Sequence, residues 1–192
     1  MATVPASYVS PEEYLERERK AETKSEYIRG EIFAMAGASI RHGRIVSNLV
    51  RELGNRLTDG PCEVFATDLR LAVDPSAMYT YPDVMVVCGD PIVIDKHKDT
   101  ITNPIVILEV LSDSTKNYDR GQKFQCYRTL SSLKDYLTIA QDEMRVERWT
   151  RQQNGQWLLT EFDRTSGAIE LQSVAVTLEI VDIYRRVDFT TQ

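Results

Sequence analysis

The sequence lacks long hydrophobic runs and an apolar leader segment. No stretch of its 192 residues approaches the ~18 consecutive apolar residues that a membrane-spanning helix requires. Near the N-terminus, Glu12, Glu13 and Glu16 stand where a signal peptide would carry its apolar segment. We therefore expect a protein that does not enter the membrane and that resides in the cytoplasm.

Cysteine is also scarce. The three cysteines, Cys62, Cys88 and Cys126, are odd in number, and their wide spacing fits neither a metal-binding pair nor a small secreted scaffold. A chain of this length can bury a sizeable core without covalent cross-links. We interpret all three as reduced, buried thiols.

An excess of positive charge is missing as well, since the formal net charge is −6. This balance speaks against a protein that coats nucleic acid through bulk electrostatics, because phosphate binding draws on clustered lysine and arginine. A metal-dependent nuclease remains compatible with it, because a divalent cation can bridge acidic side chains to phosphate.

What the chain does contain is an alternation of helix and strand patterns with no linker or repeat, which predicts one domain over residues 1–192. Capping residues and apolar spacing predict helices at residues 11–21, 39–60, 119–130 and near Ile183. Strand patterns cover residues 62–73, 81–88, 104–112 and 135–140, and a hairpin folds around Asn154-Gly155 within residues 144–163. A hairpin or kinked strand is expected at residues 26–35, and edge strands at residues 168–171 and 174–178.

Two acidic residues occur in strongly apolar strands. Glu109 lies within Pro104–Leu111, whose other members are all apolar, and Asp83 begins the apolar run Asp83–Cys88. An isolated buried carboxylate costs several kcal/mol unless it is paired, protonated or bound to a metal. Alternatively, Glu109 faces solvent or an arginine at a strand end, and Asp83 caps a turn after Pro82. Taken together, two acids on neighbouring strands indicate a site for an oxygen-preferring cation such as Mg²⁺.

Several segments resemble a known family. Tyr81–Cys88, Ile107–Ser112, Asp119–Lys123 and Tyr127 are similar to a bacterial family of restriction-endonuclease-like proteins in the PD-(D/E)xK nuclease superfamily. The resemblance covers residues 26–149. It implies an α/β (α+β) fold with a mixed central sheet flanked by helices, to which the C-terminal antiparallel hairpin would be an extension.

The same resemblance implies a DNA endonuclease that hydrolyses phosphodiester bonds with Mg²⁺ or Mn²⁺. The catalytic groups would be Asp83, Glu109 and a lysine, and the carbonyl of Val110 would be a further metal ligand. Position 111, where the superfamily has its lysine, holds leucine. Lys123 matches the lysine of this family on the following helix, and Lys116 is the alternative.

Other readings of these residues stay open. Asp119 and Lys123 could form an ordinary ion pair one helical turn apart. Glu31 and His42 match positions common in the family, although each could equally be an ordinary polar residue at a turn or a helix start. The chain could also be a catalytically inactive nuclease-fold protein that binds nucleic acid or regulates, or a domain whose acids only pair with arginines. Duplex cleavage with one site per chain would suit a homodimer.

Overall fold

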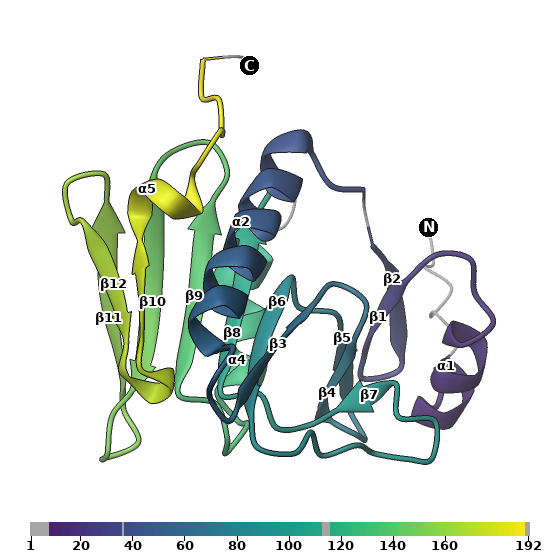
Figure 1. Ribbon diagram of the computed structural model, residues 1–192. Coiled ribbons are helices and arrows are strands. Elements are labelled where there is room, and N and C mark those ends of the chain that lie inside the picture. The colour runs from purple at the N-terminus through teal and green to yellow at the C-terminus, as the bar shows by residue number, and fades with distance from the viewer. Residues whose placement is uncertain (1–7, 36, 113–115, 191–192) are drawn as a thin grey trace.

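The computed structural model describes residues 8–35, 37–112 and 116–190, and Figure 1 shows their arrangement. The strands form two mixed sheets and a separate hairpin. The larger sheet has the order β11 (Trp157–Asp163), β10 (Arg145–Arg151), β9 (Asp135–Ala140), β8 (Val106–Leu111), β6 (Val84–Cys88), β3 (Cys62–Ala66). The smaller sheet has the order β2 (Glu31–Ala34), β1 (Ser25–Ile28), β5 (Met78–Thr80), β4 (Arg70–Asp74), β7 (Thr100–Ile101), and the hairpin pairs β12 (Ala168–Leu171) with β13 (Val176–Glu179). Helix α2 (Ile40–Leu57) lies across the larger sheet, and helix α1 (Pro11–Glu18) lies beside the smaller one (Figure 1). This arrangement is the mixed α+β fold that the sequence predicts.

The larger sheet has six strands and one parallel pair. Strand β8 (Val106–Leu111) lies between β6 (Val84–Cys88) and β9 (Asp135–Ala140), so the most apolar strand is central. Strands β8 and β9 are parallel, and every other pair of adjacent strands in this sheet is antiparallel. The remaining strands are β3 (Cys62–Ala66), β10 (Arg145–Arg151) and β11 (Trp157–Asp163).

The expected continuous strand over residues 62–73 is wrong. The chain breaks at Thr67, which has a left-handed φ of 43°, and β4 (Arg70–Asp74) then enters the smaller sheet. Consequently β3 and β4 belong to different sheets although they are neighbours in sequence. The smaller sheet also contains β1 (Ser25–Ile28), β2 (Glu31–Ala34), β5 (Met78–Thr80) and β7 (Thr100–Ile101).

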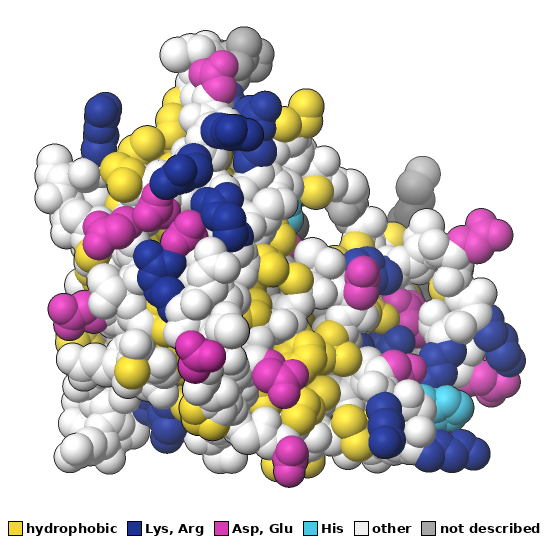
Figure 2. All heavy atoms as spheres, viewed as in Figure 1, with side chains coloured by type: hydrophobic (Ala, Val, Ile, Leu, Met, Phe, Trp, Pro, Cys, Tyr) yellow, Lys and Arg dark blue, Asp and Glu magenta, His cyan; other side chains and the backbone are white. Residues whose placement is uncertain are grey.

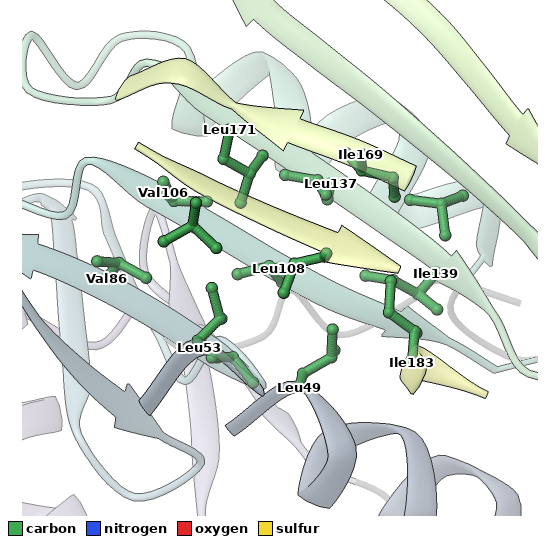
Figure 3. Packing of buried hydrophobic residues seen from close by; sticks show 14 of the residues in the cluster. Leu49, Leu53, Val86, Val106, Leu108, Leu137, Ile139, Ile169, Leu171 and Ile183 are labelled. Atoms are coloured by element: carbon green, nitrogen blue, oxygen red, sulfur yellow. The ribbon is translucent and has the colours of Figure 1, made fainter. Parts of the chain in front are cut away.

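Helix α2 (Ile40–Leu57) covers one face of the larger sheet. The hydroxyl of Ser39 caps it by accepting the His42 N–H at 3.0 Å. Leu49 and Leu53 point from the helix toward Leu108 of the central strand (Figure 3). Burial of this apolar stripe against the sheet is what stabilises the helix in the fold.

The C-terminal segment completes the same core, but not as edge strands of the larger sheet. Instead, β12 (Ala168–Leu171) and β13 (Val176–Glu179) pair with each other as a separate antiparallel hairpin. Ile169 and Leu171 are fully buried in the hydrophobic core between α2 and the larger sheet (Figure 3). The short helix α5 (Ile180–Ile183) follows.

The predicted helix over residues 119–130 is divided and ends earlier. Three consecutive turns follow one another there: α3 (Lys116–Tyr118), a π-helical turn (Asp119–Lys123) and α4 (Phe124–Tyr127). Helix α1 (Pro11–Glu18) is also shorter than expected, and its N-terminus is capped by Ser10 as the sequence indicates.

The expectation of three reduced thiols is contradicted for two of them. Cys62 and Cys88 are directly opposite each other on β3 and β6, and a disulfide joins them. Adjacent antiparallel strands bring the two side chains together, which wide spacing along the chain does not reveal. Cys126 is a free thiol.

Candidate active site

Strand pairing brings the two predicted carboxylates together. In the β6–β8 ladder, Val84 is opposite Leu108. One further step places Asp83 opposite Glu109, and the Asp83 N–H lies 3.4 Å from the Glu109 Oε2. Side chains alternate across a strand, so Glu109 shares its face with Ile107, away from α2 and toward the smaller sheet.

Glu109 is buried, and one of its carboxylate oxygens has two polar partners. Its side chain is 5 % exposed, and Oε1 is 2.9 Å from the Lys123 ammonium. The same oxygen accepts a hydrogen bond of 2.7 Å from the Tyr127 hydroxyl. Glu109 is therefore paired inside the protein and does not face solvent at a strand end.

Lys123 lies in the site because the π-helical turn directs it inward. Its ammonium is 2.9 Å from Glu109, 3.1 Å from Glu26 and 3.5 Å from Asp119, and its side chain is 7 % exposed. π-helical turns are rare and often mark functional sites. The Asp119–Lys123 contact exists, but it is one part of a larger buried cluster. The ammonium that reaches Glu109 belongs to Lys123 and not to the alternative, Lys116.

Glu26 is a member of this cluster that the sequence does not single out. It lies on β1, where it accepts hydrogen bonds from the Thr80 hydroxyl and from the Tyr118 hydroxyl at 3.3 Å. Its side chain is 10 % exposed. The only local signal is that Glu26 shares a strand face with apolar Ile28, a pattern too short to distinguish from a surface strand.

Asp83 connects the cluster to the start of α2. Its Oδ2 accepts the Val110 N–H at 2.8 Å and lies 3.2 Å from Nε2 of His42. His42 occupies the first turn of α2, so the start of the helix is fixed against the start of β6. Both predicted residues, Asp83 and His42, are therefore in contact.

Glu31 is not brought into the cluster. It lies on the exposed strand β2, opposite Ile28, and its side chain is exposed. The hairpin turn separates it from Glu26 on the neighbouring strand. The glutamate that reaches Lys123 from this hairpin is therefore Glu26.

Burial and neighbouring charge set the protonation of the cluster. Burial raises the pKa of Glu109 to about 8, while the Lys123 ammonium acts in the opposite direction. Burial opposes the charge on Lys123 too, but the surrounding Glu109 and Glu26 carboxylates outweigh it and raise its pKa well above the ordinary value. Lys123 is therefore a charged lysine in a largely dry environment. Burial raises the pKa of Tyr127, so its hydroxyl remains a hydrogen-bond donor.

The donor set suits a cation that keeps much of its own hydration. Among the described residues, no group of three or more His, Cys, Asp or Glu side chains is placed to enclose a metal ion. Oδ1 of Asp83 has no hydrogen-bond donor within the described part of the chain, and Oε2 of Glu109 has only the long contact to the Asp83 N–H. Mg²⁺ is commonly held by one or two carboxylates and several waters. The two oxygens fit such an ion.

The fold defines a mixed α+β protein, in which the buried acids around Lys123 form the candidate site. A crystal structure of a "putative nuclease belonging to DUF820" from Anabaena variabilis ATCC 29413 has the same fold, with a TM-score of 0.76. The two proteins are 21 % identical, and the alignment covers 92 % of this chain and 97 % of that one.

The chain belongs to the Uma2 family, described as "Putative restriction endonuclease", whose model matches residues 11–182. Two relatives from Synechocystis sp. (strain ATCC 27184 / PCC 6803 / Kazusa) are similar over nearly their whole length. The uncharacterized protein sll1609 is 41 % identical over 92 % of this chain and 99 % of its own. The uncharacterized protein slr1290 is 36 % identical over 97 % of each.

Across the described residues, no helix has the length and apolarity needed to cross a membrane.

Proposed function

We propose that the protein is a divalent-metal-dependent DNA endonuclease that hydrolyses phosphodiester bonds. One observation carries this proposal: four acidic residues gather around a single lysine, at the end of the central strands. Lys123 contacts Glu26, Glu109 and Asp119, and Asp83 adjoins Glu109. The cluster has more carboxylates than one ammonium can neutralise, which favours binding of a further cation.

The residues proposed to hold Mg²⁺ or Mn²⁺ are Asp83, Glu109 and the carbonyl of Val110. In a strand, the N–H and C=O of one residue point to the same side. The Val110 N–H reaches Asp83, so its carbonyl faces the same side of β8. When bound, the ion would polarise the scissile phosphate and lower the pKa of a water molecule.

Two side chains of the protein would assist the reaction, one by stabilising negative charge and one by binding phosphate or transferring a proton. Lys123 lies 2.9 Å from Glu109 and would stabilise negative charge that develops on a phosphate oxygen beside that carboxylate. His42, held against Asp83, would bind phosphate or transfer a proton.

The test is calorimetric titration of Mn²⁺ into the purified protein. We expect Asp83→Ala and Glu109→Ala each to abolish binding, because loss of one of two carboxylates removes half of the charged ligands. Glu63→Ala, which removes an exposed acid from β3, is the matched control and should bind normally. Unchanged Mn²⁺ affinity in either site variant would disprove the metal site.

A second candidate function is a nucleic-acid-binding or regulatory protein without cleavage. One observation favours it: Lys123 is buried and already shared among three carboxylates. Such a cluster could be a satisfied structural ion network. In that case the Mn²⁺ titration of the unaltered protein would be silent.

We also propose that the protein acts in the cytoplasm. We further propose that it forms a homodimer, because cleavage of both strands of a duplex needs two sites. Strand β2 is at the edge of the smaller sheet and exposes Ile32 and Phe33, which makes it the candidate contact surface. Light scattering would decide between monomer and dimer, and Phe33→Lys should dissociate a β2-mediated dimer.

A further inference from the structure

A groove of about 770 Å³ lies along the outer face of α2, beside the turn that follows α5. Four arginines line it, Arg44, Arg51, Arg185 and Arg186, and its described lining includes no acidic residue. Figure 2 shows Lys and Arg side chains gathered over α2 and α5, in the upper part of the view. A local concentration of arginine is unexpected in a chain whose net charge is −6.

Two of the four arginines have acidic partners at the border of the groove. Arg51 pairs with Glu52 at 3.1 Å, and Arg185 pairs with Asp182 at 2.6 Å. These pairs hold the two side chains in place and reduce their net charge.

The other two arginines remain available for an external anion. Arg44 and Arg186 are exposed, and within the described residues neither has a carboxylate at salt-bridge distance. A guanidinium binds a phosphate group through two parallel hydrogen bonds, which makes arginine well suited to a nucleic-acid backbone. Arg44 and Arg186 therefore carry the uncompensated positive charge of the groove.

The groove is built into the fold, because a buried side chain joins its two walls. The amide of Asn48 on α2 donates hydrogen bonds of 2.9 Å to the carbonyls of Ile183 and Arg185. Asn48 is 5 % exposed. The turn that carries Arg185 and Arg186 is thus fixed against the helix that carries Arg44.

One end of the groove lies at the first turn of α2, the turn that also contacts the carboxylate cluster. Ile40 and Gly43, in the first turn of α2, line the groove, while His42 of that turn contacts Asp83. From Arg44 to Arg51 the helix rises roughly 10 Å. Measured along the axis of a DNA duplex, this length corresponds to about three base-pair steps of ~3.4 Å. A duplex that lies along this part of the helix could therefore place several phosphates within reach of the groove.

From these contacts we propose that this arginine groove binds the phosphate backbone of a DNA duplex on the flank of the cleavage site. The proposal rests on the proposed function, and it names the surface that holds the substrate. Recognition through phosphates alone would be independent of base sequence. An acidic protein would thus bind DNA through one localised basic surface.

The experiment measures binding of the full chain to a short fluorescein-labelled DNA duplex by fluorescence anisotropy, in EDTA, over a series of salt concentrations. Removal of the metal separates binding from cleavage. In the double variant Arg44→Ala/Arg186→Ala, we expect at least about tenfold weaker binding at low salt and a plot of log K against log[salt] shallower by about 2, because two phosphate contacts are lost. The variant Arg44→Lys/Arg186→Lys keeps both charges and should retain most of the slope.

The matched control is Arg17→Ala, which removes the same charge from an exposed position on α1 and should bind as the unaltered protein does. Equal affinity and slope in the double alanine variant would overturn the groove proposal, as would absence of binding by the unaltered chain. Either result leaves the Mn²⁺ titration to decide the metal site by itself. Conversely, arginine-dependent binding in EDTA, followed by no cleavage of the same duplex when Mn²⁺ is supplied in excess, would support the groove and contradict the nuclease activity alone.

Discussion

At the scale of single residues, the buried ammonium of Lys123 decides the state of the cluster. It is within 3.1 Å of both Glu26 and Glu109, and each contact lies away from solvent. The sequence indicates Asp83, Glu109 and Lys123 because acids in apolar strands and a recognisable motif are local features. Glu26 escapes prediction because its burial depends on a strand pairing between distant segments.

Replacement of Lys123 by methionine should affect both stability and rate. Loss of the buried lysine that contacts three carboxylates should cost about 3–5 kcal/mol of the free energy of unfolding at neutral pH, the scale for breaking a buried ion pair. Any nuclease rate should fall by roughly 10²-fold or more, because a preorganised charge is lost. Urea denaturation and a plasmid-cleavage assay would measure the two effects.

Lys116→Met is the comparison for this variant. It should leave the nuclease rate close to that of the unaltered protein, since Lys123 supplies the ammonium beside Glu109. A larger loss of rate in Lys116→Met than in Lys123→Met would show that the lysine is wrongly assigned.

At the scale of elements, helix α1 is tied to the loop before β7 by charge. Arg19, at the C-terminal end of α1, binds Asp99 at 2.8 Å and Asp95 at 2.7 Å. The sequence predicts α1 from its capping serine, but not this contact, because the loop is some eighty positions away along the chain. Local signals give the start of a helix, whereas its docking depends on the tertiary fold.

This contact predicts a loss of stability in acid. The hydrogen bond from Arg19 lowers the pKa of Asp99 from 3.8 to about 2. A carboxylate with a depressed pKa in the folded state contributes stability above the unfolded value, and that contribution is lost as pH falls from about 4 to about 2. The melting temperature of the unaltered protein should therefore exceed that of Asp99→Asn at pH 6, and the difference should shrink through this range.

Asp59→Asn serves as the control, because Asp59 is exposed at the end of α2. Its difference in melting temperature from the unaltered protein should stay small at every pH. A constant gap between Asp99→Asn and the unaltered protein down to pH 2 would contradict the assigned ion pair.

At the scale of the whole molecule, the positions of the strands along the chain were easier to predict than the way the strands pair. Strand β9 and strand β12 have the predicted bounds, and the Asn154-Gly155 hairpin is confirmed by β10 and β11. The separation of β3 and β4 into two sheets was missed, as was the β12–β13 hairpin. Period-two patterns identify a strand, but pairing depends on long-range packing that a single sequence does not express.

The disulfide between Cys62 and Cys88 gives a prediction at this scale. It closes a segment with a sequence separation of 26, and such a cross-link stabilises by roughly 3–4 kcal/mol through the restricted unfolded chain. In urea denaturation, dithiothreitol should lower the free energy of unfolding of the unaltered protein by this amount. Under these reducing conditions its free energy of unfolding should equal that of Cys62→Ser/Cys88→Ser. Cys126→Ser should behave as the unaltered protein. No effect of dithiothreitol would favour the reduced thiols expected from the sequence.

The connection between the parallel strands β8 and β9 links the cluster to the folding process. Parallel neighbours require a crossover, and here the crossover is the segment that contains the π-helical turn with Lys123. Glu26, Asp83 and Glu109 come from three separate strand regions, so the cluster combines contacts of large sequence separation. Such contacts form late, because the entropy of closing long loops is lost before they contribute any stability. A newly synthesised chain would therefore assemble this cluster only when its central sheet is complete.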